Sequence, residues 1–392
     1  MNTMNHLTIS LSAFLLISFS SCNAESESKN SALADRDSVN ATVNEDKYPM
    51  STLNLPSGFK ISVFAEVENA RSLAMSASGT IYVGNRAADK VYALQDTDGD
   101  WVADKKYIIA EDLRMPNGVA FKNGDLYVAE VSKVWRFRNI ESDLANPPKP
   151  ELVYDEYPTE GHHGWKYIAF GPDGKLYVPV GAPCNICKSD DPVFASITRI
   201  NPDGSGLEIV AEGVRNTVGF TWHPDTKDLW FTDNGRDMMG DNFPPCELNR
   251  LTKTGQHFGY PYCHGGDIGD PEFGSEKPCG DFIRPIWNFG AHTAPLGLKF
   301  YTGAMFPSDY KGDVIVAQHG SWNRSKKIGY RLMRVSMEGN RATKSEVFID
   351  GWLNDNTQDA WGRPVDVLEM PDGSLLISDD YAGVIYRVAY DV

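Results

Sequence analysis

The sequence lacks a long apolar run, an excess of positive charge and any clear amphipathic helix. The apolar stretch Leu7–Phe19 is shorter than the roughly 20 residues that a helix needs to cross a bilayer. The 37 Lys and Arg residues face 53 Asp and Glu residues, and the formal net charge of −16 repels phosphate backbones and anionic lipids. No nucleic-acid partner is therefore expected, and the absence of long amphipathic helices disfavours a parallel α/β sheet.

The N-terminal segment 1–22 combines this short apolar run with small residues behind it, which predicts an export signal. Cys22 after Ser20-Ser21 has the position of a bacterial lipoprotein acceptor cysteine, although no Lys or Arg precedes the run. We expect a bacterial protein of the periplasm or the outer membrane, with a lipid anchor on Cys22 as its one membrane contact. An unlipidated signal peptide and a chance apolar N-terminus are the alternatives.

The 392 residues are enough for two average domains or one large β-architecture. Residues 23–47 are polar, charged and free of aromatics, so they cannot bury enough apolar surface to order themselves. We therefore predict a disordered tether over 23–50 and a folded domain over 51–392.

Cysteine is scarce, and outside segment 1–22 it occurs only as Cys184, Cys187, Cys246, Cys263 and Cys279. In an exported protein these residues favour disulfides over metal sites. We predict the pairs Cys184–Cys187 and Cys263–Cys279, which leave one thiol over. No His follows the Cys-x-x-Cys pair, so a covalently attached c-type haem is not expected.

A repeated pattern begins near residue 52, in which two alternating apolar runs are joined by a turn with Gly or Asp. Six copies are present, most of them followed by a third strand-like run, and the turn glycines Gly79, Gly124 and Gly174 lie 45 and 50 residues apart. Repeats of this length are typical of propeller blades. The sequence therefore predicts an all-β fold, a six-bladed β-propeller of four-stranded antiparallel blades. The run "GFKISVFAEV" near residue 60 is expected to pair with the last blade, and 255–291 to be an excursion between blades four and five.

In a propeller, the residues just before the innermost strand of each blade converge on the central axis. Counting seven residues back from the aromatic that ends each inner strand gives Arg114, His163, Arg215 and Thr293. Further polar residues near these entrances are Asn117, Asn216, His292 and Arg363. The register predicts one cavity faced by cations and histidines, and a polar channel filled with water is the alternative. Because adjacent strand residues point in opposite directions, His162 is expected to face away from the cavity.

Two acidic loops offer oxygen atoms to a cation. "DNGRDMMGD" places Asn234, Gly235, Arg236 and Asp237 after a strand, and such carboxylate and carbonyl oxygens suit Ca²⁺, with an ordinary Asn-Gly turn as the alternative. "DTDGDWVAD" (96–104) lacks the residue order of an EF-hand and is interpreted as a solvated acidic loop.

With these features in view, the chain resembles the soluble pyrroloquinoline-quinone (PQQ)-dependent sugar dehydrogenases, and most of all their sorbosone dehydrogenase-like branch. The resemblance runs from about residue 52 to 392. It is carried by "HGWKYIAFGPDGKLYVPVGAPCNIC", "GVRNTVGFTWHP", "TDNGRD", "HTAPLGLKFYTG", "HGSWNRS" and "GRPVDV…PDGSLLISDDYAGVIYRV".

The resemblance implies specific roles for the residues at these entrances. His163 would be the general base, Arg215 and Asn216 would contact the quinone, and the carbonyls of Gly235 and Arg236 would hold Ca²⁺, with Asp237 beside them. Other residues expected around the cofactor are Arg114, Asn117, Asn234, His292, Thr293, Arg324 and Arg363. Asn234 stands where the glucose enzymes have glutamine. "HGSWNRSKK" replaces the loop of their cofactor lysine, and Arg324, Lys326 and Lys327 are the alternatives for that cation.

The resemblance thus implies a quinoprotein that oxidises a sugar or a related alcohol or aldehyde, with PQQ and Ca²⁺ as cofactors. Its electrons would pass to a separate cytochrome or quinone carrier. Two alternatives remain open, a calcium-dependent lactonase-like hydrolase and a non-catalytic propeller that binds a carbohydrate or a protein.

Overall fold

The computed structural model describes residues 39–40 and 43–391. The predicted export signal, the lipid anchor on Cys22 and most of the predicted tether lie outside these residues. Within the described ranges, helical structure is limited to the 3₁₀ turns η1 (Glu45–Lys47), η2 (Met50–Thr52), η3 (Ile140–Ser142), η4 (Cys279–Asp281) and η5 (Ser308–Tyr310). No helix in these ranges is long and apolar enough to cross a membrane.

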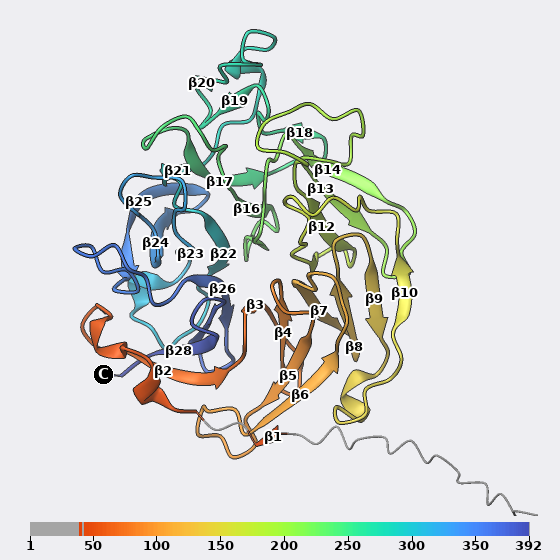
Figure 1. Cartoon of the computed structure of the whole chain (residues 1–392), viewed down its shortest axis with the longest axis vertical. Helices are drawn as coiled ribbons and strands as arrows, with labels where there is room; N and C mark the ends of the chain where they lie inside the picture. The colour runs from red at the N-terminus through yellow and green to blue at the C-terminus, as the bar shows by residue number, and fades with distance from the viewer. Residues whose placement is uncertain (1–38, 41–42, 392) are drawn as a thin grey trace, which may run out of the picture. The chain divides into compact units, whose positions relative to one another are not determined.

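Six sheets follow one another around a ring and form a six-bladed β-propeller, which confirms the predicted fold (Figure 1). Blade one consists of β3 (Ala70–Met75), β4 (Ile81–Asn85), β5 (Val91–Gln95) and β6 (Lys105–Ala110), blade two of β7 (Gly118–Lys122), β8 (Asp125–Ala129), β9 (Val134–Phe137) and β10 (Glu151–Tyr154), and blade three of β11 (Ala169–Phe170), β12 (Leu176–Val180), β13 (Ser196–Ile200) and β14 (Glu208–Glu212). Blade four contains β15 (Phe220–Trp222), β16 (Leu229–Asp233), β17 (Pro245–Leu251) and β21 (Trp287–Ala291), blade five β22 (Pro295–Phe300), β23 (Val314–Gln318), β24 (Arg331–Glu338) and β25 (Arg341–Ile349), and blade six β26 (Pro364–Glu369), β27 (Leu375–Asp379), β28 (Val384–Tyr390) and β2 (Phe59–Glu66).

The ring is closed by β2, which pairs antiparallel with β28 as the outermost strand of blade six. This confirms the predicted role of the run near residue 60. Two short strands extend other blades: β1 (Val39–Asn40) pairs with β6, and β18 (Gln256–His257) pairs parallel with β14. Closure by an early strand ties the two ends of the propeller domain together and covers the edge of β28.

The predicted position of the excursion 255–291, between blades four and five, is wrong. The strand β21 is the fourth strand of blade four, paired with β17, so the excursion lies within that blade rather than between blades four and five. The alternating burial of Phe289 and Ala291 in β21 explains this, because these side chains complete the buried face of the blade. The excursion carries the hairpin β19 (Cys263–His264) and β20 (Ile268–Gly269), which projects from the ring (Figure 1).

The hairpin turns explain the glycine spacing of the repeat. Gly79, Gly124 and Gly174 have φ angles of +93°, +89° and +78°, a backbone conformation that residues with a side chain rarely adopt. Apolar side chains then pack between neighbouring blades. Trp230 of blade four is fully buried against Phe300 of blade five, with their ring centroids 5.3 Å apart.

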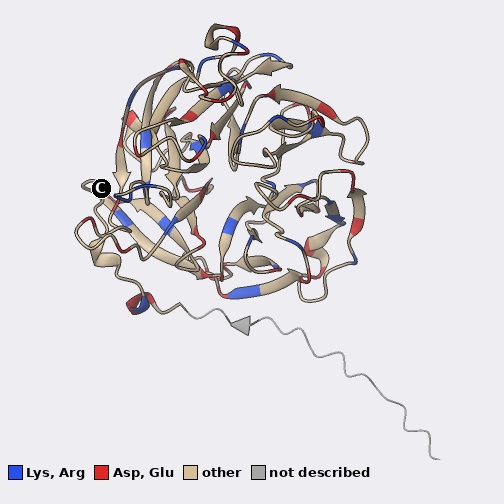
Figure 2. Cartoon of the chain, turned by 45° about the horizontal axis from the view of Figure 1, so that its top comes forward, with Lys and Arg blue, Asp and Glu red and all other residues tan. Residues whose placement is uncertain are grey.

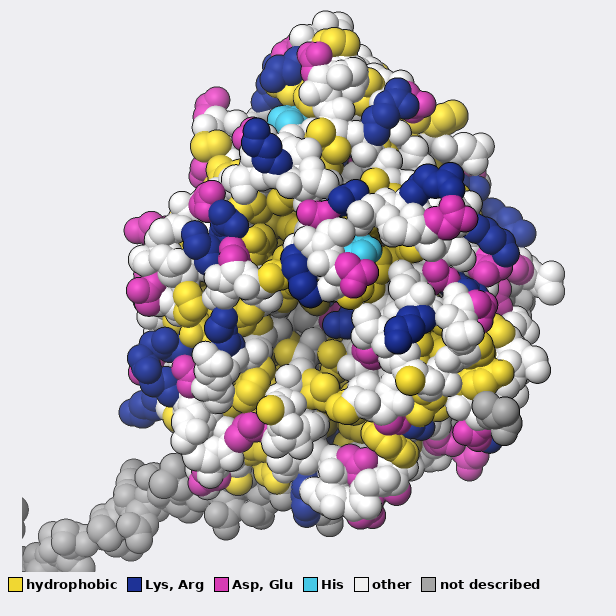
Figure 3. Space-filling model, turned by 180° about the vertical axis from the view of Figure 1, so that it is seen from behind, with side chains coloured by type: hydrophobic (Ala, Val, Ile, Leu, Met, Phe, Trp, Pro, Cys, Tyr) yellow, Lys and Arg dark blue, Asp and Glu magenta, His cyan; other side chains and the backbone are white. Residues whose placement is uncertain are grey.

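Charge does not divide the domain into an acidic and a basic half. Residues of both signs are spread around the ring (Figure 2). One face of the propeller is hollowed near its middle, and Lys and Arg side chains lie beside the hollow (Figure 3). An anionic ligand would therefore be attracted by local cations in an otherwise acidic protein.

Candidate functional site

The blade entrances surround a cavity of about 290 Å³, close to the lower end of the volumes of small-molecule sites. Among the residues predicted from the sequence, those that line it are His163, Arg215, Asn216, Asn234, Gly235, Asp237, His292 and Arg363. Val218, Leu296 and Val365 from three neighbouring blades pack with Trp165, and Val218, Leu296 and Trp165 give the cavity an apolar wall. An apolar wall with a few placed polar and charged groups is typical of a small-molecule site.

The other predicted residues lie outside this lining. Arg114 is exposed, and its Nη1 donates to the carbonyl of Thr159. Asn117 is fully buried and accepts a hydrogen bond from Arg71 Nε at 2.7 Å, so it supports a cavity residue from behind. Thr293 is also fully buried and donates to Gly290 O.

Arg236 and Arg324 point to partners in neighbouring loops. The guanidinium of Arg236 pairs with Asp270 at 2.6 Å and with Glu272 at 3.2 Å. Arg324 donates to Lys326 O and to Asp241 O. Neither residue lines the cavity.

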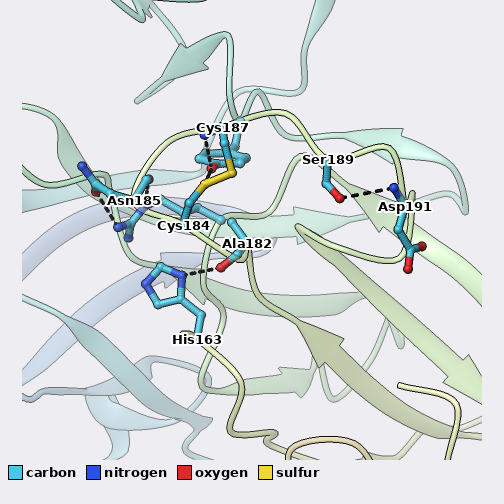
Figure 4. The surroundings of a disulfide bond; sticks show 9 residues. His163, Ala182, Cys184, Asn185, Cys187, Ser189 and Asp191 are labelled. Carbon is cyan, nitrogen blue, oxygen red and sulfur yellow. Dashed lines mark hydrogen bonds between the residues drawn. A yellow bond between two sulfur atoms is a disulfide. The ribbon is translucent and has the colours of Figure 1, made fainter. Parts of the chain in front are cut away.

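His163 is held as a neutral imidazole with a defined tautomer. Its ring Nδ1 lies 2.9 Å from Ala182 O, and because a carbonyl only accepts, Nδ1 carries the proton (Figure 4). Nε2 then keeps a free lone pair. Burial, and next the charge of Arg215, lowers the pKa of His163 well below 6.5. His163 also has a φ of +50°, an uncommon conformation for a non-glycine residue and one that is frequent at functional sites.

The neighbouring histidines lack this arrangement. His162 is exposed, as expected, but strand alternation is not the reason, because both histidines lie in a turn before β11 and their ring centroids are 4.0 Å apart. His292 donates from Nε2 to Gly240 O at 2.8 Å, and the carboxylate of Asp237, 3.6 Å from its Nδ1, raises its pKa. His319 bonds Asp380 through Nε2 at 2.7 Å. His163 is therefore the cavity histidine best suited to accept a proton.

Arg215 is fixed by the protein through all five of its N–H groups. It donates to both the main-chain and side-chain oxygens of Asn185, to the carbonyls of Asn234 and Gly235, and to the carboxylate of Asp237. Its backbone is fixed as well, because Asp233 accepts from the amides of Arg215 and Asn216. This guanidinium faces the cavity as an oriented charge.

The loop between Cys184 and Cys187 supports both His163 and Arg215. The disulfides Cys184–Cys187 and Cys263–Cys279 are formed, as predicted, and Cys246 is free and buried. Asn185, inside the first disulfide, accepts from Arg215 and donates to Asp237 O. Ala182, just before the disulfide, accepts from His163 (Figure 4). A short cross-linked segment thus orients two cavity residues from different blade entrances.

Replacing Asn185 with alanine is expected to lower the free energy of unfolding by about 1–3 kcal/mol. The change leaves Arg215 Nη2 and the amide of Asp237 without the oxygen that both now bind, and buried donors without a partner cost this much. Urea unfolding measures the effect. The matched control is Ser189→Ala, because Ser189 is exposed and, among the described residues, bonds Asp191 alone (Figure 4). Equal stability of the two variants would contradict the role of Asn185.

One side of the cavity offers oxygen atoms to a cation. Asn234 Oδ1 is buried and has no hydrogen-bond partner in the described part of the chain, and Gly235 O and the Asp237 carboxylate lie on the same wall. These hard, partly anionic donors fit Ca²⁺, although Gly235 O and Asp237 now accept from Arg215. At the second acidic loop, Asp96, Asp98 and Asp104 lie close together, and Asp96 and Asp104 accept from amides of their own loop.

Blade one also contributes to the cavity, which the sequence pattern does not predict. Arg71, Arg86 and, from blade three, Trp165 line it beside His319. The inner strand β3 ends at Met75 instead of an aromatic residue. The count of seven residues back from an aromatic, which gives His163 in blade three, therefore has no starting point in blade one. A count from the turn glycine Gly79 would have placed the strand.

A model of a protein domain of unknown function, DUF7133, matches residues 46–389. The chain belongs to the DUF7133 family. An uncharacterized protein of Borreliella burgdorferi is 33% identical to this DUF7133 chain over 356 residues, which are 87% of this chain and 92% of that protein.

Solved structures with the same fold as this DUF7133 chain include PQQ enzymes. The holo form of the PQQ domain of pyranose dehydrogenase from Coprinopsis cinerea has a TM-score of 0.74 and 17% identity, covering 86% of this chain and 97% of that chain. A calcium structure of a Trichoderma reesei carbohydrate-active enzyme of family AA12 gives 0.73 and 19%, with the same coverage. PQQ-bound aldose sugar dehydrogenase from Streptomyces coelicolor gives 0.62 and 20%, covering 86% and 100%. At these identities the similarity establishes the propeller fold.

Proposed function

We propose that this protein is a quinoprotein oxidoreductase, which oxidises a sugar or a related alcohol or aldehyde and transfers hydride to PQQ. The observation that carries the proposal is the neutral His163, oriented by Ala182 and set beside Arg215 in a cavity lined by four arginines. A general base next to fixed cations suits the removal of a proton from a substrate hydroxyl and the binding of an anionic cofactor. The PQQ-containing neighbours with this fold support the same function.

The cavity residues fit PQQ and Ca²⁺ in their chemistry. PQQ is a flat tricarboxylate, and the arginines that line the cavity, Arg71, Arg86, Arg215 and Arg363, supply the opposite charge. Asn234 Oδ1, which has no partner among the described residues, together with Gly235 O and Asp237, would hold Ca²⁺. When bound, PQQ would supply the hydride acceptor, and Ca²⁺ would supply a Lewis acid for the quinone carbonyl.

His163 contributes the proton transfer. Its Nε2 takes the proton of the substrate hydroxyl, while the Nδ1–H bond to Ala182 O keeps the ring in place and stabilises the imidazolium that forms. The apolar wall of Val218, Leu296 and Trp165 excludes water from this step. Because no haem attachment motif is present, the electrons leave to a separate carrier, a cytochrome or a quinone.

The pH profile of kcat/KM is expected to keep its plateau from pH 8 to about 6.5 and to fall only at lower pH. A base whose pKa is lowered stays unprotonated to a more acidic pH, and burial together with Arg215 lowers the pKa of His163. Steady-state dye reduction in constant ionic strength buffers measures the profile. An acid limb centred at pH 7 or above would contradict a neutral, buried base.

The function is tested by adding PQQ and CaCl₂ to the purified protein. We expect a new quinone absorption band and reduction of an artificial dye that depends on a sugar or an alcohol from a panel of substrates. Uptake of metal with lactone hydrolysis and no PQQ binding would favour the hydrolase instead. Carbohydrate binding without PQQ uptake or turnover would favour a binding propeller.

A further inference from the structure

We propose that Arg86 and Trp165 form the subsite that binds a carboxylate of the cofactor. This subsite would replace the lysine that the glucose enzymes supply from another loop. The inference rests on the proposed function and deepens it, since it names which cation of the cavity is available to the ligand.

The four arginines that line the cavity differ in how many of their N–H groups already donate to protein oxygens. Arg215 uses all five N–H groups on protein oxygens. Arg71 is bound to Asn117 and pairs with Asp380 at 2.5 Å, and its side chain is 2% exposed. Arg215 therefore has no N–H group left for a ligand, and the charge of the buried Arg71 is already balanced by the carboxylate of Asp380.

Arg363 uses some of its N–H groups on protein oxygens, whereas, among the described residues, the guanidinium of Arg86 only contacts the ring of Trp165. Arg363 donates to the carbonyls of His319 and Gly320. The guanidinium of Arg86 has no hydrogen bond and no ion pair with any residue in the described part of the chain. Burial lowers the pKa of Arg86 most. The nearby charges of Arg71 and Arg363 lower it further, whereas the charge of Asp380 raises it. A ligand carboxylate would relieve this repulsion.

The backbone of Arg86 is fixed even though its guanidinium is free. Asn69 Oδ1 accepts from the amides of Arg86 and Ala87 at 2.8 and 2.6 Å, just beyond the end of β4. Gly84, two residues before Arg86, lies against the carbonyl of Asn117. A Cβ at this position would be 2.0 Å from the carbonyl oxygen and would clash. The start of the Arg86 side chain is thus set by a rigid strand end, which lowers the entropy cost of binding.

Trp165 directs the guanidinium and adds a donor of its own. The Arg86 Cζ lies 3.9 Å from the centroid of the Trp165 ring, so the face of the guanidinium is covered and its N–H edge stays open. The Trp165 Nε1 is buried and has no hydrogen-bond partner among the described residues. A planar N–H fork beside an unpaired indole N–H is suited to a carboxylate, which accepts two hydrogen bonds from the fork.

The residues of the loop 318–327 do not provide this cation. Arg324 donates to Asp241 O and Lys326 O, and Lys327 Nζ donates to Gln358 O at 2.6 Å. Lys326 is exposed, and none of the three lines the cavity.

The test is the dissociation constant of PQQ, measured by isothermal titration calorimetry in saturating CaCl₂ without substrate. Arg86→Gln is expected to weaken binding about 10- to 100-fold, because a charge-assisted hydrogen bond is lost, and Trp165→Phe to weaken it several-fold while keeping the ring. Arg138→Gln, on the exposed outer side of blade two, is the matched loss of charge and should not change the constant. Thermal melting of each variant checks that the fold is retained.

The outcomes separate this inference from the proposed function. If the unmodified protein does not bind PQQ, the proposed function fails and the inference with it. If it binds PQQ and Arg86→Gln binds equally well, the subsite is overturned while the function stands. Loss of affinity in Arg324→Gln, with Arg86→Gln unchanged, would assign the role to the loop 318–327 and would also overturn the inference.

Discussion

Replacing His163 with alanine is expected to reduce PQQ-dependent dye reduction by about 10²–10⁴-fold, the usual loss when a general base is removed. The physical reason is that the Nε2 lone pair is the acceptor for the substrate proton, and no other cavity histidine presents one in the same way. The measurement is kcat at saturating substrate, with PQQ loading checked by its absorption. Affinity for the cofactor should change much less than turnover.

Two variants guard this result against a folding artefact. His163 has a φ of +50°, where alanine is strained, whereas asparagine adopts this conformation more readily than most residues. His163→Asn should therefore keep the fold and lose turnover to the same extent. His162→Ala, at the exposed neighbour, should retain most of the activity. Near-full turnover in His163→Asn would remove His163 from the mechanism.

The fold was predictable because each blade repeats the same local sequence pattern, two alternating apolar runs joined by a turn. Alternating apolar runs give strands, and the glycines at 79, 124 and 174 occupy turns with positive φ, so strand pairing follows from local sequence. The pairing of β2 with β28 was also predictable, since a single unpaired apolar run remained. The excursion was misplaced because β21 follows a long insertion, and only the buried face of blade four selects it as the fourth strand.

The site was predictable only in part, for a different reason. Counting back from the aromatic that ends an inner strand predicts which residue of that blade lies at the entrance to the cavity. His163 and Arg215 line the cavity, as expected. Whether a guanidinium is free depends on hydrogen bonds from distant segments: Arg215 is bound by Asn185, 30 residues away. Sequence spacing holds no information on such partners. It therefore could not distinguish the saturated Arg215 from the unpaired Arg86.

Replacing Arg71 with methionine is expected to lower the free energy of unfolding by about 3–5 kcal/mol at pH 7.5, because it removes one partner of a buried ion pair. Arg71 and Asp380 have side chains that are 2% and 9% exposed, at 2.5 Å from each other. Burial alone would raise the pKa of Asp380, yet His319 and Arg71 hold it well below its usual range. Without Arg71 the carboxylate stays buried with His319 as its main partner.

The effect of pH gives this prediction its sharpest test. In the unmodified protein the lowered pKa of Asp380 contributes stability at every pH above about 4, the value of an unfolded Asp, and this contribution is lost as pH falls below it. In Arg71→Met one of the two groups that lower the pKa of Asp380 is lost, so acidification protonates the carboxyl at a higher pH than in the unmodified protein and removes the penalty for burying its charge. The difference in stability between the two proteins should therefore shrink from pH 7.5 to 5, as measured by urea unfolding. Arg341→Met, which breaks an ion pair with Glu338 whose side chains are 72% and 68% exposed, should change stability little at either pH. A loss in Arg71→Met that is small at pH 7.5, or that grows on acidification, would contradict a structural role for the Arg71–Asp380 pair.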